Sequence, residues 1–249
     1  MLKNYFKTAW RSLARGRLFT LVNLSGLVVG MAGAALILLW LANEVSFDRF
    51  HVNKDRLYQV YGLTDIPGLK HTAIPVVSYP LAPALKQQYP DVEMASRMDY
   101  VDFLLTANNK GFTNINGGVV DADFLRMFSF PLVFGELTGQ LTDMHSMVIT
   151  EKLAMKFFGT TNAVGKTIRI DSVDNFTVTG VLKDLPDNTQ FKFEYLLSWS
   201  YLKKIGRDND DWLSNRVWTY VLLRPGTDVT AFNAKIRNLS RTRSGRNDV

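Results

Sequence analysis

The feature that most constrains this chain is an uninterrupted apolar stretch near its N-terminus. The 25 residues from Leu18 to Ala42, "LFTLVNLSGLVVGMAGAALILLWLA", include no charged side chain. As an α-helix the stretch would be about 37 Å long, enough to cross a hydrocarbon core of roughly 30 Å. The apolar region of a cleaved signal peptide is shorter, roughly 7–15 residues. Although Ala32-Gly33-Ala34 resembles a cleavage site, the run continues beyond it, and the stretch predicts a retained transmembrane helix.

The positive charge of the chain is concentrated before this stretch. Five of the 29 basic residues precede Asn43, whereas none of the 23 acidic residues does. Because Lys and Arg are enriched on the cytoplasmic side of membrane helices, the N-terminus is predicted to be cytoplasmic. The chain from about Asn43 onward is then extracytoplasmic. The remaining 24 basic and 23 acidic residues nearly cancel, so the net charge of +6 gives no reason to expect a nucleic-acid partner.

Residues 1–17 predict a cytoplasmic amphipathic helix that lies in the membrane interface. One helical face is apolar, and the opposite face is cationic and suited to anionic lipid headgroups. The apolar positions are Leu2, Phe6, Trp10 and Leu13. The residues assigned to the membrane interface are Lys3, Lys7, Trp10, Arg11, Arg15 and Arg17. A simple positively charged leader to the membrane helix is the alternative, but it would not require the aromatic and leucine face.

Small residues recur at helical spacing inside the apolar stretch. Gly26, Gly30 and Ala34 follow one another at intervals of four, and Gly33 lies beside them. Small residues at this spacing let a second helix approach closely. The four residues are therefore predicted to form a helix-packing face. Glycine is also common in membrane helices generally, so a lone anchor stays open as the alternative.

Residues 43–240 predict an extracytoplasmic α+β domain, with short helices and strands in irregular alternation. "SYPLAPALKQQYP" and "MHSMVITEKLAMKFFG" each contain a helix, and "KTIRIDSVDNFTVTGVLKDLP" contains a pair of strands. A further short helix, capped by Asp121, is expected in "VVDADFLRMFSFPLVFGE". We expect two subdomains. Residues 241–249 are polar and are expected to be disordered.

The stretch "FFGTTNAVGKTIRID" superficially resembles the phosphate-binding loop G-x-x-x-x-G-K-[ST]. Five residues separate Gly159 from Gly165, one more than the motif has. The preceding segment predicts a helix that is capped by Thr150 and ends at Gly159, and the following segment predicts a strand. A phosphate loop instead connects a strand to a helix, so no nucleotide is expected here.

No other pattern indicates catalytic, cofactor or metal-binding residues. The chain has no cysteine, and its histidines, His51, His71 and His145, lack the spacing that would gather them on a metal. "DNDDW" at 208–212 resembles half of a calcium loop but lacks the required glycine and closing glutamate, so it is expected to be a solvated loop. No G-x-S-x-G nucleophile motif is present. We therefore expect no enzyme active site and no cofactor.

Taken together, four stretches resemble the N-terminal part of MacB/FtsX-type permeases of ATP-binding-cassette (ABC) transporters. They are "NYFKTAWRSLARGRLFTLVNLSGLVVGMA", "FDRFHVNKDRLYQV", "VDADFLRMFSFPLVFGE" and "ITEKLAMKFFGTTNAVGKTIRID" with the following "FTVTGVLKDLP". The resemblance implies an interfacial helix, a first transmembrane helix and a MacB-like periplasmic core domain. It also implies that the chain resides in the bacterial cytoplasmic (inner) membrane. In such proteins the "GKT" region ends a helix and begins a strand.

The resemblance further implies a role in export or mechanotransmission, in which a separate cytoplasmic ABC ATPase drives movements outside the membrane. The expected partners are that ATPase, a second permease copy or homologous permease, and membrane lipids. Because the chain stops at Val249, it is expected to be the N-terminal portion of a permease. The alternative is a membrane-anchored extracytoplasmic sensor, whose cytoplasmic tail of 17 residues would be too short for a signalling module. An anchored envelope enzyme would lack a catalytic constellation.

Overall fold

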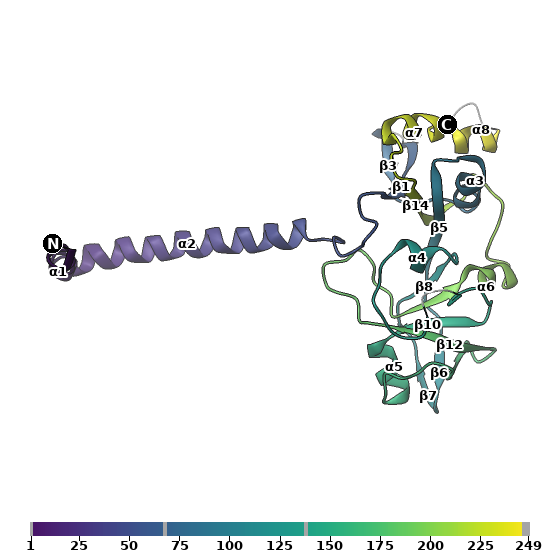
Figure 1. Ribbon diagram of the computed structural model, residues 1–249, viewed down its shortest axis with the longest axis horizontal. Coiled ribbons are helices and arrows are strands. Elements are labelled where there is room, and N and C mark those ends of the chain that lie inside the picture. The colour runs from purple at the N-terminus through teal and green to yellow at the C-terminus, as the bar shows by residue number, and fades with distance from the viewer. Residues whose placement is uncertain (1, 67–68, 137–138, 246–249) are drawn as a thin grey trace. The chain divides into compact units, whose positions relative to one another are not determined.

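The computed structural model describes residues 2–66, 69–136 and 139–245. The chain divides into two compact units, Met1–Phe47 and Asp48–Val249. The first unit is helical, and the second, which we call the folded domain, contains every strand of the described residues (Figure 1).

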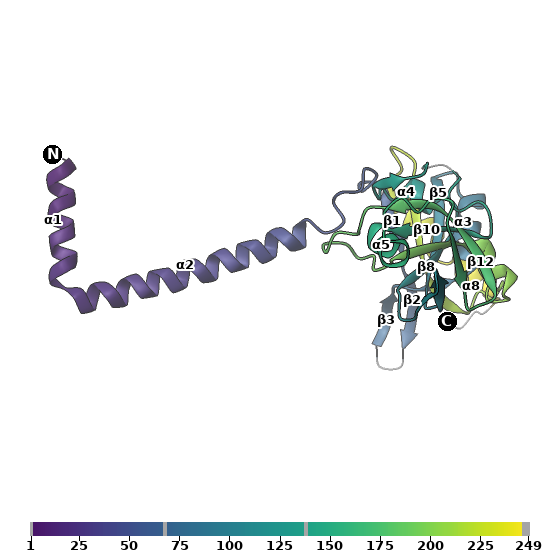
Figure 2. The same cartoon turned by 90° about the horizontal axis from the view of Figure 1, so that it is seen from below.

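The first unit consists of helices α1 (Leu2–Arg15) and α2 (Arg17–Val45). Gly16, with φ −98° and ψ 53°, lies outside the helical region and separates them; the chain changes direction between the two helices (Figure 2). The 29 residues of α2 extend about 43 Å. Its most apolar stretch of 18 residues has a mean hydropathy of 2.2 and is not buried against any other described residue. The expected apolar helix is therefore present, and its length and composition suit a membrane span.

Short helices lie along the sheet of the folded domain. They are α3 (Leu81–Gln88), α4 (Phe124–Met127), α5 (Glu151–Phe158), α6 (Trp199–Lys204), α7 (Val229–Ile236) and α8 (Leu239–Ser244). Figure 1 shows α7 and α8 at one end of the domain and α5 towards the other end.

The strands form a twelve-stranded mixed sheet and a separate two-stranded hairpin. Their bounds are β1 (Leu57–Val60), β2 (Gly62–Ile66), β3 (Leu69–Ile74), β4 (Val77–Ser78), β5 (Val92–Val101), β6 (Leu105–Ala107), β7 (Lys110–Phe112), β8 (Gly117–Val120), β9 (Leu132–Phe134), β10 (Ser146–Thr150), β11 (Thr167–Ile170), β12 (Asp174–Leu182), β13 (Tyr195–Ser198) and β14 (Asn215–Leu223).

The large sheet runs in the order β1-β14-β5-β8-β13-β10-β12-β11-β6-β7, with β4 paired to β14 and β9 to β12. Two pairs, β8 with β13 and β10 with β12, are parallel, and the others are antiparallel. The central strands β8, β10 and β13 are buried at every position, as expected for strands covered on both faces. In β11 buried and exposed residues alternate, which is the pattern of a strand covered on one face. The second sheet is the hairpin of β2 and β3.

The core consists of three hydrophobic clusters arranged along this sheet. One gathers around Tyr195 and Phe157, a second around Phe124 and Phe191, and a third around Phe232. The α+β class is thus confirmed. The expected division into two subdomains is not found, because Asp48–Val249 forms a single compact unit and its large sheet is continuous.

Two local predictions need correction. Asp121 does not cap α4: the N-cap position is Asp123, and its side chain makes no capping hydrogen bond. The carboxylate of Asp121 binds Arg97 instead. The segment 241–249 was expected to be disordered, but α8 continues to Ser244, while 246–249 lie outside the described residues.

The region around "GKT" has the predicted helix-to-strand order. The side chain of Thr150 accepts a hydrogen bond from Leu153 N at the start of α5, and Gly159 ends the helix with a left-handed φ of 67°. Strand β11 begins at Thr167, directly after Lys166. No helix therefore starts at the "GKT" stretch to present its backbone N–H groups to a phosphate.

Candidate coupling site

The predicted helix-packing residues lie along one side of α2 and have no partner within the described chain. A methyl group placed on Gly26, Gly30 or Gly33 would meet nothing within 4 Å. Ala34 is exposed, and α2 has no buried residue. The small-residue face is thus available to a helix of another chain or segment, but its use in packing stays a prediction.

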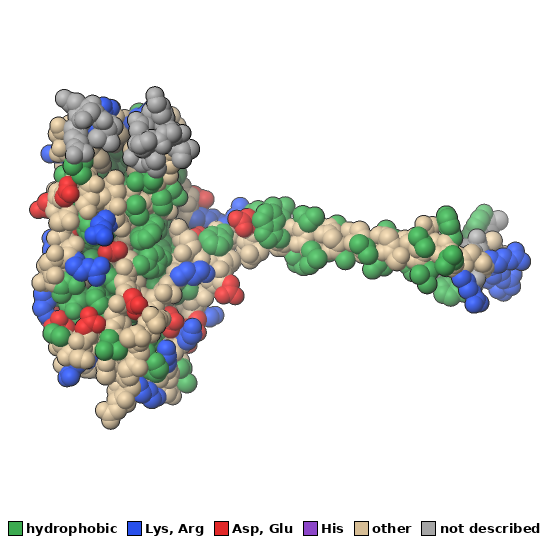
Figure 3. Space-filling view, turned by 180° about the vertical axis from the view of Figure 1, so that it is seen from behind, with side chains coloured by type: hydrophobic (Ala, Val, Ile, Leu, Met, Phe, Trp, Pro, Cys, Tyr) green, Lys and Arg blue, Asp and Glu red, His purple; other side chains and the backbone are tan. Residues whose placement is uncertain are grey.

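The predicted interface residues lie on α1 and at the start of α2. All six are exposed, namely Lys3, Lys7, Trp10, Arg11, Arg15 and Arg17. Figure 3 shows Lys and Arg gathered at this end of the unit and hydrophobic side chains distributed along α2. The side chains of Leu2, Phe6 and Leu13 are not among those described. A helix is therefore present as expected, and its position at a membrane surface stays a prediction.

Sequence reasoning did not identify the place where the chain enters the folded domain, which we call the junction segment, Asp48–Asn53. Asp48 adopts a left-handed conformation with φ 54°, which is uncommon for a residue other than glycine. Its backbone N–H donates to Asn188 O at 3.0 Å. Its carboxylate accepts hydrogen bonds from the Thr189 hydroxyl and from Gln190 N, the latter at 3.3 Å. These contacts fix the first residue of the domain against a loop distant in sequence.

The side chain of His51 anchors the junction segment in an aromatic cluster. It is only 2% exposed and lies 5.1 Å from the ring centroids of both Phe128 and Phe130. Its Nδ1 accepts a hydrogen bond from Ser129 N at 3.1 Å, which assigns the proton of the neutral ring to Nε2. Burial lowers the pKa of His51, and the charge of Asp48, whose Oδ1 lies 3.9 Å from Nε2, opposes this shift. His51 is therefore a neutral, buried anchor.

Two further hydrogen bonds tie the same segment to the end of α4 and the loop after it. Val52 N donates to the Ser129 hydroxyl at 3.1 Å, and Asn53 Nδ2 donates to Met127 O at 3.2 Å. The junction segment is thus held by residues 127–129 on one side and 188–190 on the other. Both loops border the cluster of Phe124, Phe128 and Phe191. The junction segment is therefore in direct contact with the core.

The buried neutral state of His51 predicts that the stability of the domain depends on pH. An unfolded histidine titrates near pH 6.5, and burial lowers the folded pKa below that value. The contribution of neutral His51 is full above about pH 6.5 and is lost as the pH falls, because the unfolded chain then binds the proton first. The contribution of His51 to the free energy of unfolding changes by at most about 1.4 kcal/mol per pH unit. Denaturant unfolding between pH 7.5 and 5.5 should show a smaller slope for His51→Gln than for the unchanged protein.

The control for this prediction is Val52→Gln, because Val52 is 82% exposed and does not titrate. The free energy of unfolding of this variant should change with pH as steeply as that of the unchanged protein. Equal slopes for all three proteins would show that His51 does not take up its proton on unfolding, contrary to the prediction.

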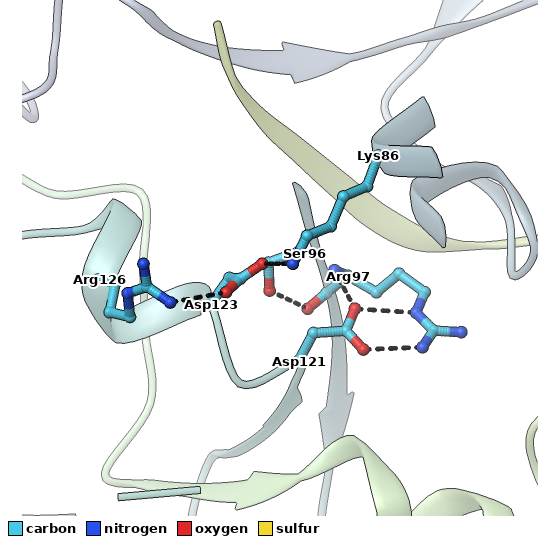
Figure 4. A network of polar contacts seen from close by, with 6 residues as sticks. All are labelled: Lys86, Ser96, Arg97, Asp121, Asp123 and Arg126. Atoms are coloured by element: carbon cyan, nitrogen blue, oxygen red, sulfur yellow. Dashed lines mark hydrogen bonds and ion pairs between the residues drawn. The ribbon is translucent and has the colours of Figure 1, made fainter. Parts of the chain in front are cut away.

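A buried ionic network stabilises the middle of the sheet (Figure 4). Arg97 on β5 forms two hydrogen bonds with the Asp121 carboxylate, Nη2 to Oδ1 at 2.7 Å and Nε to Oδ2 at 2.9 Å. Its guanidinium lies 4.0 Å from the Trp199 ring centroid and 3.5 Å from Asp208 Oδ1. The Asp208 side chain is only 10% exposed, so the expectation of a solvated loop is wrong at this residue. The network joins β5, the end of β8, α6 and the loop after α6.

A neighbouring acidic residue is paired with two cations. The Asp123 carboxylate accepts from Lys86 of α3 and lies 3.4 Å from Arg126 Nη1 of α4 (Figure 4). His145 belongs to another polar group, in which its Nε2 lies 3.9 Å from Asp174. The hydrogen bond from Lys204 to Asp174 lowers the pKa of that carboxyl. Within the described part of the chain, no group of three or more His, Asp or Glu residues could hold a metal ion.

A membrane-length apolar helix followed by a folded mixed-sheet domain is the architecture of a membrane-anchored protein, and the family of the folded domain is an extracytoplasmic one. Residues 20–239 match the family described as MacB-like periplasmic core domain. The match covers most of the chain, and the chain therefore belongs to this family. It is accordingly a permease-type component of an ABC transporter, and the family implies association with an ATPase subunit and other transporter components. A comparison with curated proteins found no match.

Solved structures with a similar fold include a domain of a putative permease protein from Porphyromonas gingivalis. It is 26% identical, with a TM-score of 0.64, and the alignment covers 77% of this chain and 86% of that one. The periplasmic region of MacB from Actinobacillus actinomycetemcomitans is 16% identical, with a TM-score of 0.58 and coverage of 78% and 86%. The extracellular domain of the noncanonic ABC-type transporter YknZ from Gram-positive bacteria is 15% identical, with a TM-score of 0.55 and coverage of 77% and 95%. The last two show likeness of fold alone.

Proposed function

We propose that the chain forms the N-terminal portion of the permease subunit of an ABC-type export or mechanotransmission system. In this role a separate cytoplasmic ATPase moves α2, and the junction segment passes that movement to the folded domain. The observation that carries the proposal is the fixation of Asp48 and His51 into the domain core. A protein that only anchors a domain to a membrane needs no such fixation.

The connection between α2 and the junction segment is short and hydrogen-bonded. Ser46 N donates to Ala42 O at 3.1 Å, and Phe47 N donates to Glu44 O at 3.3 Å. Asp48, the next residue, is already held by Asn188. A long flexible linker would absorb a movement of the helix, so a connection of only two residues favours the proposed coupling.

The remaining features support specific partners. The small-residue face of α2 suits a second permease copy or a homologous permease, and the cationic α1 suits anionic lipids. We place the N-terminus in the cytoplasm and the folded domain on the outer side of a bacterial inner membrane, with the ATPase as the site of ATP hydrolysis. The alternative, a membrane-anchored extracytoplasmic sensor, shares the anchor and the domain but requires neither an ATPase nor coupling through the junction.

A flexible insertion at the junction tests the coupling. About ten Gly and Ser residues placed between Phe47 and Asp48 in the assembled transporter should leave ATP hydrolysis intact, since the insert lies outside the ATPase. Export or activation of an extracytoplasmic target per ATP hydrolysed should fall several-fold, because a flexible linker of this length dissipates movement. The same insert beside Asn109, in the exposed turn between β6 and β7, is the control and should preserve coupling. Unchanged coupling after the junction insert would refute the proposed role.

The orientation can be tested because the chain has no cysteine. Val52 is 82% exposed, so Val52→Cys provides a single accessible thiol next to the junction without disturbing the core. In intact spheroplasts an impermeant maleimide should label it fully, since positive charges retain the N-terminus in the cytoplasm. Labelling is read by mass shift. A matched Lys7→Cys on α1 should react only after the membrane is permeabilised, and the reverse pattern would contradict the orientation.

A further inference from the structure

A groove of about 1020 Å³ lies between the edge of the large sheet and the last two helices. Residues 58–63, which run from β1 into the start of β2, line one wall, and residues of α7 and α8 line the other. Apolar side chains, including Trp212, Phe232 and Ile236, contribute much of the lining. Figure 3 shows hydrophobic side chains in a band over this end of the domain.

The strand wall of the groove is an edge of the sheet. β1 is the terminal strand of the sheet order, and β14 is the strand that pairs with it among the described residues. Tyr58, Gln59 and Val60 of β1 all line the groove. Because side chains alternate between the two faces of a strand, three consecutive lining residues indicate that the groove reaches the edge of β1. The site therefore combines a strand edge with a facing helix.

The register shows which backbone groups of β1 point into this space. Leu223 N donates to Arg56 O at 2.9 Å across the β1–β14 pair. In an antiparallel ladder, residues alternate between facing the partner strand and facing away from it. Tyr58 and Val60 thus bond to β14, whereas the N–H and C=O groups of Leu57 and Gln59 face the open edge. These groups can accept another strand.

The charged residues among the described groove lining are all basic. Arg237 and Arg241 lie among its lining residues, and no described lining residue is Asp, Glu or Lys. The Arg237 side chain is exposed at the end of α7, where a guanidinium can pair with a carboxylate. The lining therefore complements a ligand that is apolar in part and carries negative charge.

We propose that this groove binds an extended, acidic segment of a partner polypeptide, which adds to β1 as a further strand. Backbone hydrogen bonds to Leu57 and Gln59 hold the segment, as in other cases of strand addition. Alternate side chains of the segment face the apolar wall of Trp212 and Phe232, and its carboxylates lie near Arg237. This binding is separate from coupling to an ATPase and holds whether or not the chain transports anything.

The test measures fluorescence anisotropy of labelled peptides with the full chain in lipid nanodiscs. The acidic probe is about eight residues long, with valine and glutamate alternating so that it favours an extended conformation. One control probe has lysine in place of glutamate, and another has the acidic sequence with N-methylated backbone amides that cannot pair. We expect saturable binding of the acidic probe and binding at least about tenfold weaker for both controls, a difference of about 1.4 kcal/mol.

Two matched pairs of variants localise the binding. Gln59→Pro removes an N–H that faces the open edge, which an edge strand tolerates, whereas Gln59→Ala keeps that N–H. Arg237→Glu reverses a charge in the groove, whereas Lys203→Glu reverses one on α6, outside the groove. Both Gln59 variants lose the hydrogen bond from Gln59 Nε2 to Pro75 O at 3.2 Å, so Gln59→Pro should weaken binding of the acidic probe about tenfold at the melting temperature of Gln59→Ala. Arg237→Glu should weaken the acidic probe and strengthen the lysine probe, and both control variants should bind like the unchanged protein.

Several results would overturn the proposal. If neither the acidic nor the lysine probe binds saturably, the strand edge does not bind a peptide. Two results would indicate a charged apolar surface without strand addition. One is that the N-methylated probe binds as tightly as the acidic probe. The other is that binding of the acidic probe responds to Arg237→Glu but not to a folded Gln59→Pro. If the chain self-associates through the groove, sedimentation would show an oligomer that Gln59→Pro and Arg237→Glu dissociate, and the occupant would be a second copy instead of a partner.

Discussion

Replacing Gly26 and Gly30 together with leucine is expected to abolish assembly of the permease while leaving insertion of α2 into the membrane intact. Leucine is more favourable than glycine in a hydrocarbon environment, so insertion should be normal or improved. Both glycines are open on α2, with nothing within 4 Å of an added methyl group, so the chain itself accommodates the change. A neighbouring helix in close contact cannot accommodate the change, because two leucine side chains would push the two helix backbones apart. Co-purification of a tagged and an untagged copy, together with transport-coupled ATPase activity, measures the loss.

The control places the same side chains on another side of the helix. Val28 and Met31 are 57% and 64% exposed, and Val28→Leu with Met31→Leu places two leucines away from the small-residue face. This pair controls for the presence of two leucines, although it adds far less volume than the glycine pair, and it should assemble and function normally. If both pairs assemble equally and function survives, α2 is only an anchor, and the sensor alternative gains support.

Gly117→Ala is expected to destabilise the folded domain by about 3 kcal/mol, the upper end of overpacking penalties in a well-packed core. A Cβ at this position would lie 2.1 Å from Cζ of Tyr195, whose ring is fully buried. Tyr195 cannot move freely, because its hydroxyl accepts a hydrogen bond from Phe103 N at 3.3 Å. The two residues are register partners on β8 and β13, in the middle of the sheet. Denaturant unfolding of the domain provides the measurement.

Gly111→Ala supplies the matched glycine control. Its Cβ would lie 3.7 Å from Thr106 Oγ1, which is an ordinary contact, and β7 is an edge strand, so the change should cost less than about 0.5 kcal/mol. In the double variant Gly117→Ala with Tyr195→Leu, the smaller side chain should relieve the clash, so the two effects should not add. Additive effects, or a Gly117→Ala cost equal to that of Gly111→Ala, would contradict the packing argument.

The elements with strong local patterns could be predicted without tertiary information. The Thr150 cap, the Gly159 terminus and the strand after Lys166 all depend on contacts between near neighbours, and each is confirmed. The assignment of Asp121 as a helix cap was wrong because local preference competed with a partner from another strand. An acidic residue before a short helix has the same sequence pattern whether it caps the helix or binds Arg97.

The junction and the groove could not be predicted for a similar reason. His51 had no pattern that distinguished it from the other histidines, because its aromatic surroundings come from residues 128–130 and 191. The groove forms where β1 lies near α7, which follows it by about 170 residues. Segments so distant in sequence are brought together only by the pairing of strands.

By itself, the sequence determined the apolar membrane-length helix, the cationic segment before it, the small-residue stripe and the α+β character of the remainder. Each depends on composition or periodicity along a single segment, which local chain geometry converts into structure. Only the tertiary structure decided that His51 is a buried anchor, that Gly117 has no room for a methyl group, and that β1 is left as an open edge beside α7. These properties arise from close packing and strand order between segments far apart in the chain, and no local pattern encodes them.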